Sequence, residues 1–230
     1  MPRLTTTLFA TIALLTCGST AFAEVNVSCD DPANPELLIT CTSSCSVTVS
    51  VEGDAVVVHD GVSDTRSTCA VAASQIPYTN IVFMGSPEND SFQLAEGATF
   101  SSSGGRWGIS AYGGDGNDTF HGTHLNDNLS GGAGHDILRG YDGDDRLSGD
   151  AGDDFLYGSA GRDELNGGDG ADVLYGDEGA DKLRGGGDRD VIHGGEGRDD
   201  IDGGEDTDRI EGDAEDRCVD CSTDAYLSLR

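Results

Sequence analysis

GGAGHDILR (residues 131–139), GYDGDDRLS (140–148) and GDAGDDFLY (149–157) are three consecutive units of the nine-residue repeat that decides the fold of this chain. Eleven such units run from residue 113 to residue 211, and a decayed twelfth, GDAEDRCVD, starts at Gly212. The first position is Gly in all twelve units, the sixth is Asp in the first eleven, and the eighth is always Phe, Leu, Ile or Val. A period this strict predicts a solenoid, in which each unit buries its apolar residue by stacking on its neighbours.

Each unit combines residue types suited to a metal-binding loop with residue types suited to a strand. Glycines at positions one, two and four allow the positive φ angles of a tight loop and let the backbone approach a ligand closely. Main-chain carbonyls and the position-six carboxylate supply oxygen ligands, of which Ca²⁺ takes about six to eight. The last three positions mostly alternate polar, apolar and polar, as in Thr119-Phe120-His121, which predicts a three-residue strand with one inward side chain.

The pattern G-G-x-G-x-D-x-U-x, where U is apolar, resembles the RTX (repeats-in-toxin, haemolysin-type) calcium-binding nonapeptide. This resemblance implies an all-β fold, a right-handed parallel β-roll in which two units make one turn and Ca²⁺ lies between a loop and the loop two units later. The aspartates that it assigns to calcium are Asp118, Asp136, Asp154, Asp172, Asp190 and Asp208 on one edge, and Asp127, Asp145, Asp163, Asp181 and Asp199 on the other. Adjacent pairs give five plus four, or nine, possible sites.

Some units depart from the family pattern, which weakens the expected sites at both ends of the repeat block. The middle of the block, residues 131–181, matches the pattern best. An acidic, Gly-rich stretch could also be a disordered tail. Disorder gives no reason to keep an apolar residue at every ninth position, so the periodicity favours the roll. The departures are Leu125, Asp188, Asp206 and Glu215 in place of the fourth-position Gly, and Arg217 in place of the sixth-position Asp.

Charge predicts that the repeat block needs its ions in order to fold. The chain has 43 acidic and 13 basic residues and a formal net charge of −30. Stacking carboxylates at the roughly 4.8 Å spacing of neighbouring strands costs about 1 kcal/mol per pair even in water. We therefore expect the block to be largely disordered without Ca²⁺ and to fold on binding it. The core that opposes this repulsion is one thin row: Phe120, Leu129, Leu138, Leu147, Leu156, Leu165, Leu174, Leu183, Ile192, Ile201 and Ile210.

The amino-terminal segment predicts export. Arg3, an apolar run over residues 8–15 and the Ala21-Phe22-Ala23 site are typical of a secretory signal peptide spanning residues 1–23. The apolar run is too short to cross a membrane. We therefore expect the Sec route and a secreted, periplasmic or outer-surface protein of a bacterium, although most RTX proteins lack such a signal. Lipoprotein processing at Cys17 is an open alternative.

Cysteine usage agrees with an exported protein. Removal of the signal peptide leaves an even number, which predicts disulfides: Cys29, Cys41, Cys45, Cys69, Cys218 and Cys221. The sequence favours Cys218–Cys221 as a local bridge and two bonds among the first four cysteines, but the connectivity stays open. This C-x-x-C segment could instead be a redox pair or half of a zinc site, although no second C-x-x-C and no thioredoxin-like pattern accompany it.

The segment before the repeats is expected to cap the roll. Gly85, Asp90 and Phe92 match positions one, six and eight of the repeat, and Gly85 precedes Gly113 by 28 residues, one more than three periods. We interpret this as a degenerate early coil with an insertion around residues 101–105. Strands are expected at residues 47–51, 55–58 and 81–83. The predicted division is a signal peptide at 1–23, a disulfide-pinned β cap at 24–112, the roll at 113–220 and a tail at 221–230.

Catalytic motifs are missing from the sequence. It contains neither H-E-x-x-H nor G-x-S-x-G. His59-Asp60 with Ser63 suggests a hydrolase only weakly, because all three lie in one turn-like stretch. His121 and His124 could bind a transition metal but are better interpreted as surface residues of the roll. We therefore predict that the protein is not an enzyme.

The leading prediction is an exported calcium-binding protein whose roll is a rigid structural or adhesive module, with contacts to a cell surface or to other copies. A strongly negative surface argues against nucleic acid as a partner and against insertion into anionic membranes. The alternative is a small enzyme or toxin with its activity in residues 24–112 and the roll as a calcium-triggered folding device. A glycan or ice surface is less favoured, because the outward residues vary too much to predict a regular ladder: Arg139, Tyr157, Tyr175, Arg184 and His193.

Overall fold

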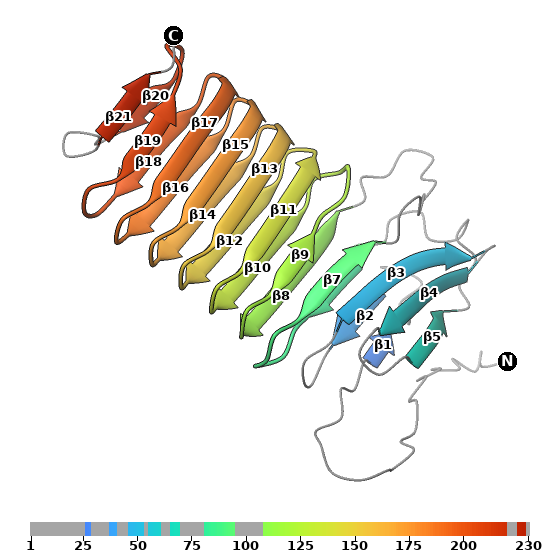
Figure 1. Ribbon diagram of the computed structural model, residues 1–230. Coiled ribbons are helices and arrows are strands. Elements are labelled where there is room, and N and C mark those ends of the chain that lie inside the picture. Colours follow the sequence, from blue (N-terminus) through green and yellow to red (C-terminus); the bar gives the residue numbers. More distant parts are fainter. Residues whose placement is uncertain are drawn as a thin grey trace, which may run out of the picture.

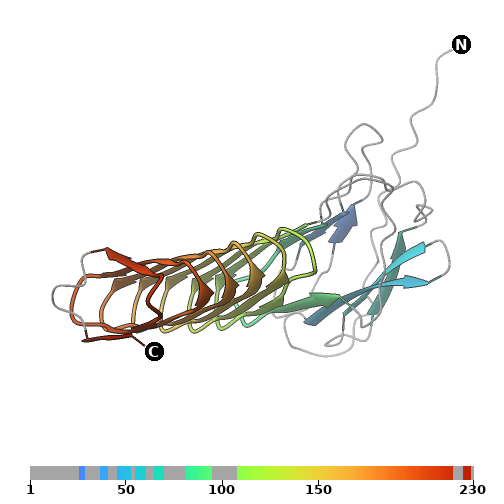
Figure 2. The same ribbon diagram turned by 90° about the horizontal axis from the view of Figure 1, so that it is seen from above.

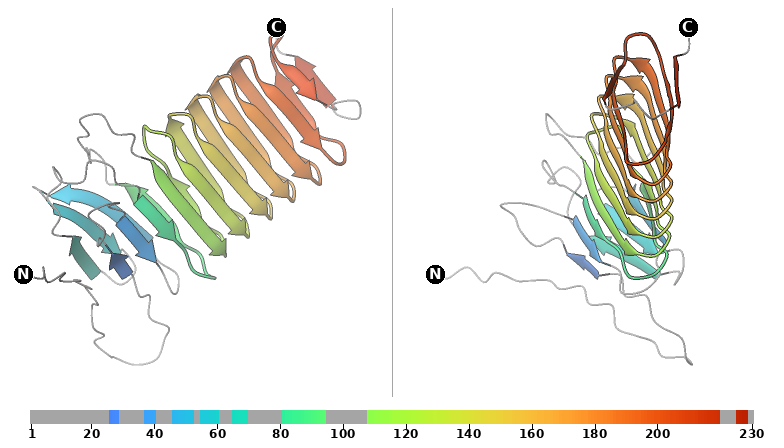
Figure 3. Two further views of the ribbon diagram at one scale, coloured as in Figure 1. Left: turned by 180° about the vertical axis from the view of Figure 1, so that it is seen from behind. Right: turned by 90° about the vertical axis from the view of Figure 1, so that its left-hand side faces the viewer.

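The computed structural model describes an elongated solenoid of two facing sheets (Figure 1). The described residues contain strands and turns but no helix, and so none that could cross a membrane. Seen from above, the two sheets form opposite walls of a flattened coil (Figure 2), and a view along the coil shows how narrow it is (Figure 3). The described residues are 26–28, 37–40, 46–52, 55–60, 65–69, 81–94, 108–219 and 225–228.

Consecutive strands of the roll alternate between the two sheets. The even sheet contains β8 (Ile109–Asp115), β10 (Asn128–Ala133), β12 (Arg146–Ala151), β14 (Glu164–Asp169), β16 (Lys182–Gly187), β18 (Asp200–Gly204) and β20 (Arg217–Val219). The odd sheet contains β9 (Thr119–His121), β11 (Ile137–Asp142), β13 (Phe155–Gly161), β15 (Val173–Gly179), β17 (Val191–Gly197), β19 (Arg209–Gly212) and β21 (Ala225–Ser228).

Within each of these stacks all strands are parallel, and the repeat sets their register. Leu138 lies beside Leu156 in the odd sheet, and Leu147 lies beside Leu165 in the even sheet. Each neighbour is therefore eighteen residues away, which corresponds to two nine-residue units per turn. The parallel roll implied by the family resemblance is confirmed.

The position-eight residues form the core, as predicted. All eleven side chains from Phe120 to Ile210 point between the sheets, and each is at most 2% exposed. At the amino-terminal end the same row continues through larger residues, where the ring of Phe83 lies 5.2 Å from that of Phe92 and 5.4 Å from that of Phe120. The interior is therefore thin, with one apolar side chain from each strand, and each turn buries it against its neighbours.

The predicted three-residue strands are too short. Most strands of the roll have six or seven residues and continue from position seven of one unit to position three or four of the next, as β11 and β13 do. The reason is that ladder pairing extends through the glycine segment, where Tyr141 pairs with Ser159 and Asp142 with Ala160. β9 keeps the predicted length of three residues.

The degenerate early coil is present. β6 pairs in parallel with β8, and β7 pairs with β9, which places Phe92 beside Phe120 although 28 residues separate them. The expected strands also occur, within β3, β4 and β6. Antiparallel pairs β1–β2 and β3–β4–β5 then end the two sheets. The strands of this region are β1 (Asn26–Ser28), β2 (Leu37–Thr40), β3 (Ser46–Glu52), β4 (Ala55–Asp60), β5 (Thr65–Cys69), β6 (Ile81–Met84) and β7 (Ser91–Leu94).

Several predictions concern parts of the chain outside the described residues. These are the signal peptide at 1–23, the insertion at 101–105, and Cys29, Cys41, Cys45 and Cys221. Cys218 is disulfide-bonded. Its pairing with Cys221 and the disulfides of the cap stay predictions.

One face of the odd sheet carries a stacked ladder, contrary to the prediction that its residues vary too much. The Arg139 guanidinium lies 5.0 Å from the centre of the Tyr157 ring, and the rings of Tyr157 and Tyr175 stack at 5.2 Å. The ring of His193 follows at 4.6 Å from Tyr175. The ladder was missed because alternate units belong to different sheets. Arg184 does not belong to this ladder, because it lies in the even sheet, where it pairs with Asp202.

Replacement of Tyr175 by Ala is expected to lower the free energy of unfolding by about 1–2 kcal/mol, because this ring stacks on a planar group on each side. Tyr175→Phe keeps both stacks and should differ from the wild type by less than about 0.5 kcal/mol. Urea unfolding followed by circular dichroism measures both values. Equal losses in the two variants would show that the hydroxyl, and not the stack, stabilises this face.

Candidate metal centre

The eleven predicted aspartates lie in two rows, one along each edge of the roll. Asp136 ends the turn that leads from β10 to β11, and Asp145 ends the turn that leads from β11 to β12, so consecutive units contribute to opposite edges. Every one of the eleven carboxylates is buried, with at most 3% of the residue exposed. The sequence therefore predicted correctly which aspartates form the two rows. Because their carboxylates are buried, each oxygen needs a hydrogen-bond donor or a cation in place of water.

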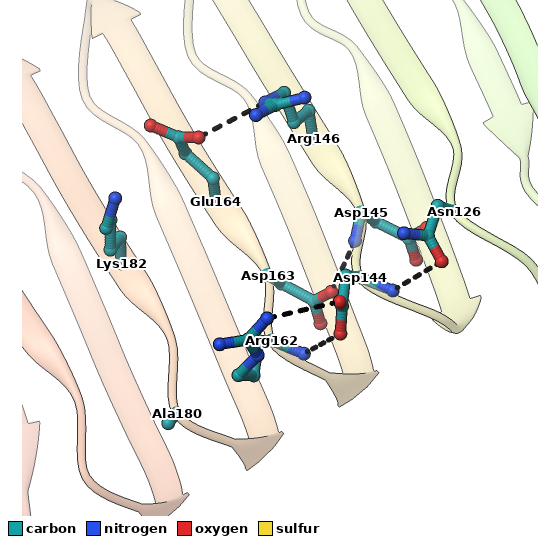
Figure 4. A pocket seen from close by; sticks show the side chains of 9 residues that line it. All are labelled: Asn126, Asp144, Asp145, Arg146, Arg162, Asp163, Glu164, Ala180 and Lys182. Atoms are coloured by element: carbon teal, nitrogen blue, oxygen red, sulfur yellow. Dashed lines mark hydrogen bonds and ion pairs between the residues drawn. The ribbon is translucent and has the colours of Figure 1, made fainter.

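One oxygen of each carboxylate joins a ladder along its edge. The backbone N–H of Asp118 donates to Oδ1 of Asp136 at 2.7 Å, and that of Asp145 donates to Oδ1 of Asp163 at 2.8 Å (Figure 4). The same bond recurs every eighteen residues up to Asp190 N–H and Asp208 Oδ1. Charge-assisted bonds of this kind fix the orientation of the carboxylates.

The other oxygen has no hydrogen-bond partner in nine of the loops. A buried carboxylate oxygen without a donor is strongly unfavourable, because burial removes its water without replacing it. Nine such atoms in register indicate that a ligand supplies the missing positive charge. They are Oδ2 of Asp118, Asp136, Asp145, Asp154, Asp163, Asp172, Asp181, Asp190 and Asp199.

The position-one glycines show where such a ligand fits. A Cβ atom on Gly149 would lie 2.2 Å from Oδ2 of Asp154 and 2.7 Å from the carbonyl oxygen of Gly167. The same two kinds of oxygen lie close to the corresponding point at Gly113, Gly167 and Gly185. A carboxylate oxygen of one loop and a carbonyl oxygen of the loop two units later thus converge, and hard oxygen ligands of this type suit Ca²⁺.

This arrangement corrects the role expected for the position-one glycine. Its φ is not left-handed in any of the described units, whereas positions two and four do take positive φ. Gly at position one is required because a side chain would occupy the space between the two oxygens. Asp188 and Asp206, which replace the position-four glycine, keep the left-handed conformation with φ of 66° and 71°.

Burial raises the pKa of the row carboxyl groups. The pKa of Asp145 rises to about 8, and that of Asp118, Asp154 and Asp190 to about 7. Loss of solvation is the largest cause, donated backbone N–H groups oppose it, and neighbouring carboxylates raise the pKa further. The pKa of Asp136 is also raised, and that of Asp127, Asp163, Asp172, Asp181 and Asp199 rises to about 6.

In two loops the protein itself supplies a donor to Oδ2 of the carboxylate. Oδ2 of Asp127 accepts the N–H of Thr123 at 2.6 Å and its hydroxyl at 3.1 Å. Oδ2 of Asp90 in the early coil accepts the N–H of Ser86 at 2.5 Å. Sequence reasoning did not separate these loops from the others, although the β-branched Thr123 is a signal, because such residues rarely take positive φ.

The twelfth unit also has an acid in the row, which the sequence interpretation missed. Asp216, one position earlier than expected, accepts the N–H of Asp199 on Oδ1 at 3.0 Å. Its Oδ2 accepts the N–H of Asp213 at 2.5 Å. The loop is one residue shorter than the others, so Arg217 at position six does not leave the row without an acid.

Other polar groups of the described residues do not form a second metal site. No three His, Cys, Asp or Glu side chains among them are grouped so that they could hold an ion. His121 stacks on Tyr141, and its Nδ1 lies 2.8 Å from the tyrosine hydroxyl. The even-sheet side of the roll has a charged depression where Arg146 pairs with Glu164 at 3.2 Å and Arg162 with Asp144 at 3.5 Å (Figure 4). Exposed pairs of this kind contribute little stability.

Comparison with known families identifies the repeat. The family described as RTX calcium-binding nonapeptide repeat (4 copies) matches residues 110–123, 125–156, 148–183, 157–192 and 184–216. No curated protein and no solved structure matches the chain.

Proposed function

This chain belongs to the RTX calcium-binding nonapeptide repeat family through residues 110–216, and we propose that it is an exported calcium-binding protein whose roll acts as a rigid structural or adhesive module. The observation that carries the proposal is the two rows of buried carboxylate oxygens without hydrogen-bond partners, most of which converge with a carbonyl oxygen of the loop two units later. In this proposal the position-six aspartates are the calcium ligands, together with backbone carbonyls.

Calcium would also supply folding free energy. Neighbouring carboxylates of a row are eighteen residues apart in sequence but lie in adjacent loops of the same edge. If they ionise without a cation, like charges are therefore close together. A divalent ion between two loops neutralises this charge and joins neighbouring turns. Because each turn of a solenoid contacts only its neighbours, joined turns should fold cooperatively. Calcium would therefore act as a structural part of the roll.

Export agrees with this chemistry. Residues 1–23 resemble a Sec signal peptide, and Ca²⁺ outside cells is often near millimolar, so sites with dissociation constants of about 10⁻⁴–10⁻³ M would fill there. The roll presents two long faces, one on each sheet, which suits a structural or adhesive role.

A calcium titration of the chelator-treated protein tests the proposal. We expect far-UV circular dichroism to show a cooperative transition from coil to β structure as Ca²⁺ rises through the micromolar to millimolar range, because ion binding and folding are coupled. Magnesium is the control and should act weakly, since it demands a smaller, octahedral site. A chelated protein that is already fully β, and that Ca²⁺ leaves unchanged, would refute calcium as the folding ligand.

A further inference from the structure

We propose that the backbone conformation of position two decides which loops bind Ca²⁺, and that the loops at residues 85–90, 122–127 and 212–216 are closed to it. This inference rests on the proposed function, since it concerns the same rows of carboxylates. It divides loops with the same acid into two classes. In one class Oδ2 of the acid is open to an ion, and in the other Oδ2 accepts a hydrogen bond from the protein.

The conformation of position two separates the two classes without exception. This holds for the nine loops whose carboxylate has an oxygen without a hydrogen-bond partner and for the three closed loops. Each of the nine has a left-handed residue at position two, with φ between 70° and 123°. In each of the three, position two is outside this conformation and its N–H donates to Oδ2 of the acid. The left-handed residues are Gly114, Gly132, Tyr141, Asp150, Ser159, Gly168, Asp177, Gly186 and Gly195.

The sequence explains each closed loop. Thr123 is the only β-branched residue at position two, and a β-branched residue with positive φ is a rare outlier. Ser86 precedes Pro87, and a residue before proline is restricted to extended conformations. Asp213 lies in the loop that is one residue short, where Asp216 is only three residues away.

A closed carboxylate has little to gain from an ion. Asp127 accepts the N–H of Ile109 on Oδ1 at 2.5 Å, and on Oδ2 it accepts both the N–H and the hydroxyl of Thr123. Calcium would have to break the bonds to Oδ2 before it could use this oxygen. A Cβ on Gly122 would still lie 2.6 Å from Oδ2 of Asp127 and 2.6 Å from the carbonyl oxygen of Gly140, so the oxygens of a site are present and the N–H of Thr123 occupies one of them.

The positions of the closed loops suggest what they do. The loop at 85–90 begins one edge row of the described residues, the loop at 122–127 begins the other, and the loop at 212–216 ends that second row. Among the described residues the row holds no further acid beyond each of these loops, so an ion there would have fewer carboxylates around it. Backbone capping completes these ends without metal, as the terminal units of a solenoid require.

Reciprocal substitutions at position two test the inference. Thr123→Gly permits the left-handed conformation, and we expect the protein to bind one more Ca²⁺ per chain than the wild type. Ser159→Thr places a β-branched residue where φ is 84°, and we expect one Ca²⁺ fewer. Thr123→Val removes the hydroxyl but keeps the β-branched side chain that disfavours left-handed φ, so its stoichiometry should not change.

Bound calcium is measured on the full chain by equilibrium dialysis and metal analysis, with native mass spectrometry as a second readout. If Thr123→Gly binds the same number of ions as the wild type, the inference is overturned, whether or not Ser159→Thr folds. A gain in Thr123→Val equal to that in Thr123→Gly would also overturn it, because the hydroxyl alone would then close the loop. A wild type that binds no Ca²⁺ would instead refute the proposed function.

Discussion

Replacement of Gly149 by alanine is expected to lower the free energy of unfolding of the calcium-loaded protein by about 3 kcal/mol and to remove one bound Ca²⁺. Gly149 lies inside β12, and its backbone conformation is one that alanine can adopt. The added methyl group would lie 2.2 Å from Oδ2 of Asp154 and 2.7 Å from the Gly167 carbonyl oxygen, so both must move. These are the two oxygens that converge on the proposed ion, and neither can retreat easily from a parallel ladder.

Gly187→Ala is the matched control. Gly187 also lies in a strand of the even sheet and is not left-handed, but the nearest atoms to its Cβ would be at ordinary contact distances of 3.8 and 3.9 Å. We expect this variant to stay within about 0.5 kcal/mol of the wild type and to keep its calcium stoichiometry. Urea unfolding in millimolar Ca²⁺ and metal analysis provide both readouts. Equal effects of the two substitutions would show that Gly149 matters only through strand propensity.

The parts of the structure that the sequence predicted are those set by the period alone. Once every ninth residue is apolar, stacking at two units per turn buries Leu138 on Leu156 and simultaneously aligns Asp136 with Asp154. The same period identified Phe92 as part of the row despite the 28-residue offset. A repeated pattern thus fixes the core and both edges together, because the same register governs all three rows.

The parts that could not be predicted depend on contacts between loops of adjacent turns. The motif gives Gly at both positions one and two, yet the first is needed for space and the second for positive φ. Asp216 takes the place of the missing sixth-position Asp in the row only because its loop is one residue short, which a fixed nine-residue alignment hides. The ladder from Arg139 to His193 becomes visible only when units are compared with the second unit along the chain.

The metal-free roll is expected to gain stability on acidification, from about pH 8 to about pH 5. Burial raises the pKa of Asp145 to about 8 and that of Asp118 and Asp154 to about 7 in the folded state, whereas an unfolded chain has values near 4. The folded state therefore binds protons more tightly. Its stability is fully present below about pH 4 and is lost as the pH rises through about 6 to 8.

This pH dependence is measured in chelator as the β content by far-UV circular dichroism at several pH values, with urea unfolding at those pH values where the metal-free roll is folded. With calcium present the trend should reverse in the same range, because the ion must displace these protons and its half-saturating concentration should rise as the pH falls. Each pH unit by which a pKa is displaced corresponds to about 1.4 kcal/mol, so several buried carboxyl groups together give a large effect. If the stability of the chelated protein rose towards neutral pH, the prediction that burial raises the pKa of the row carboxyl groups would be wrong.

Asp145→Asn separates the two roles of a row carboxylate, and we expect opposite effects with and without calcium. The amide keeps an oxygen to accept the N–H of Asp127, and its NH₂ group would lie near the carbonyl of Gly158. It removes a buried charge, so the chelated protein at about pH 8 should become more stable, by at least about 1 kcal/mol. The calcium-loaded protein should instead lose one ion and the stability that this ion supplied.

Asp144→Asn is the matched control, because it changes the net charge equally at an exposed position, where only an exposed contact with Arg162 is weakened. It should leave the stability of both the chelated and the calcium-loaded protein within about 0.5 kcal/mol of the wild type. If both Asp145 and Asp144 variants shifted the two states in the same direction, net charge would explain the result. If only Asp145→Asn stabilises the chelated protein and destabilises the calcium-loaded one, the same buried carboxylate destabilises the metal-free roll and binds the ion that stabilises it.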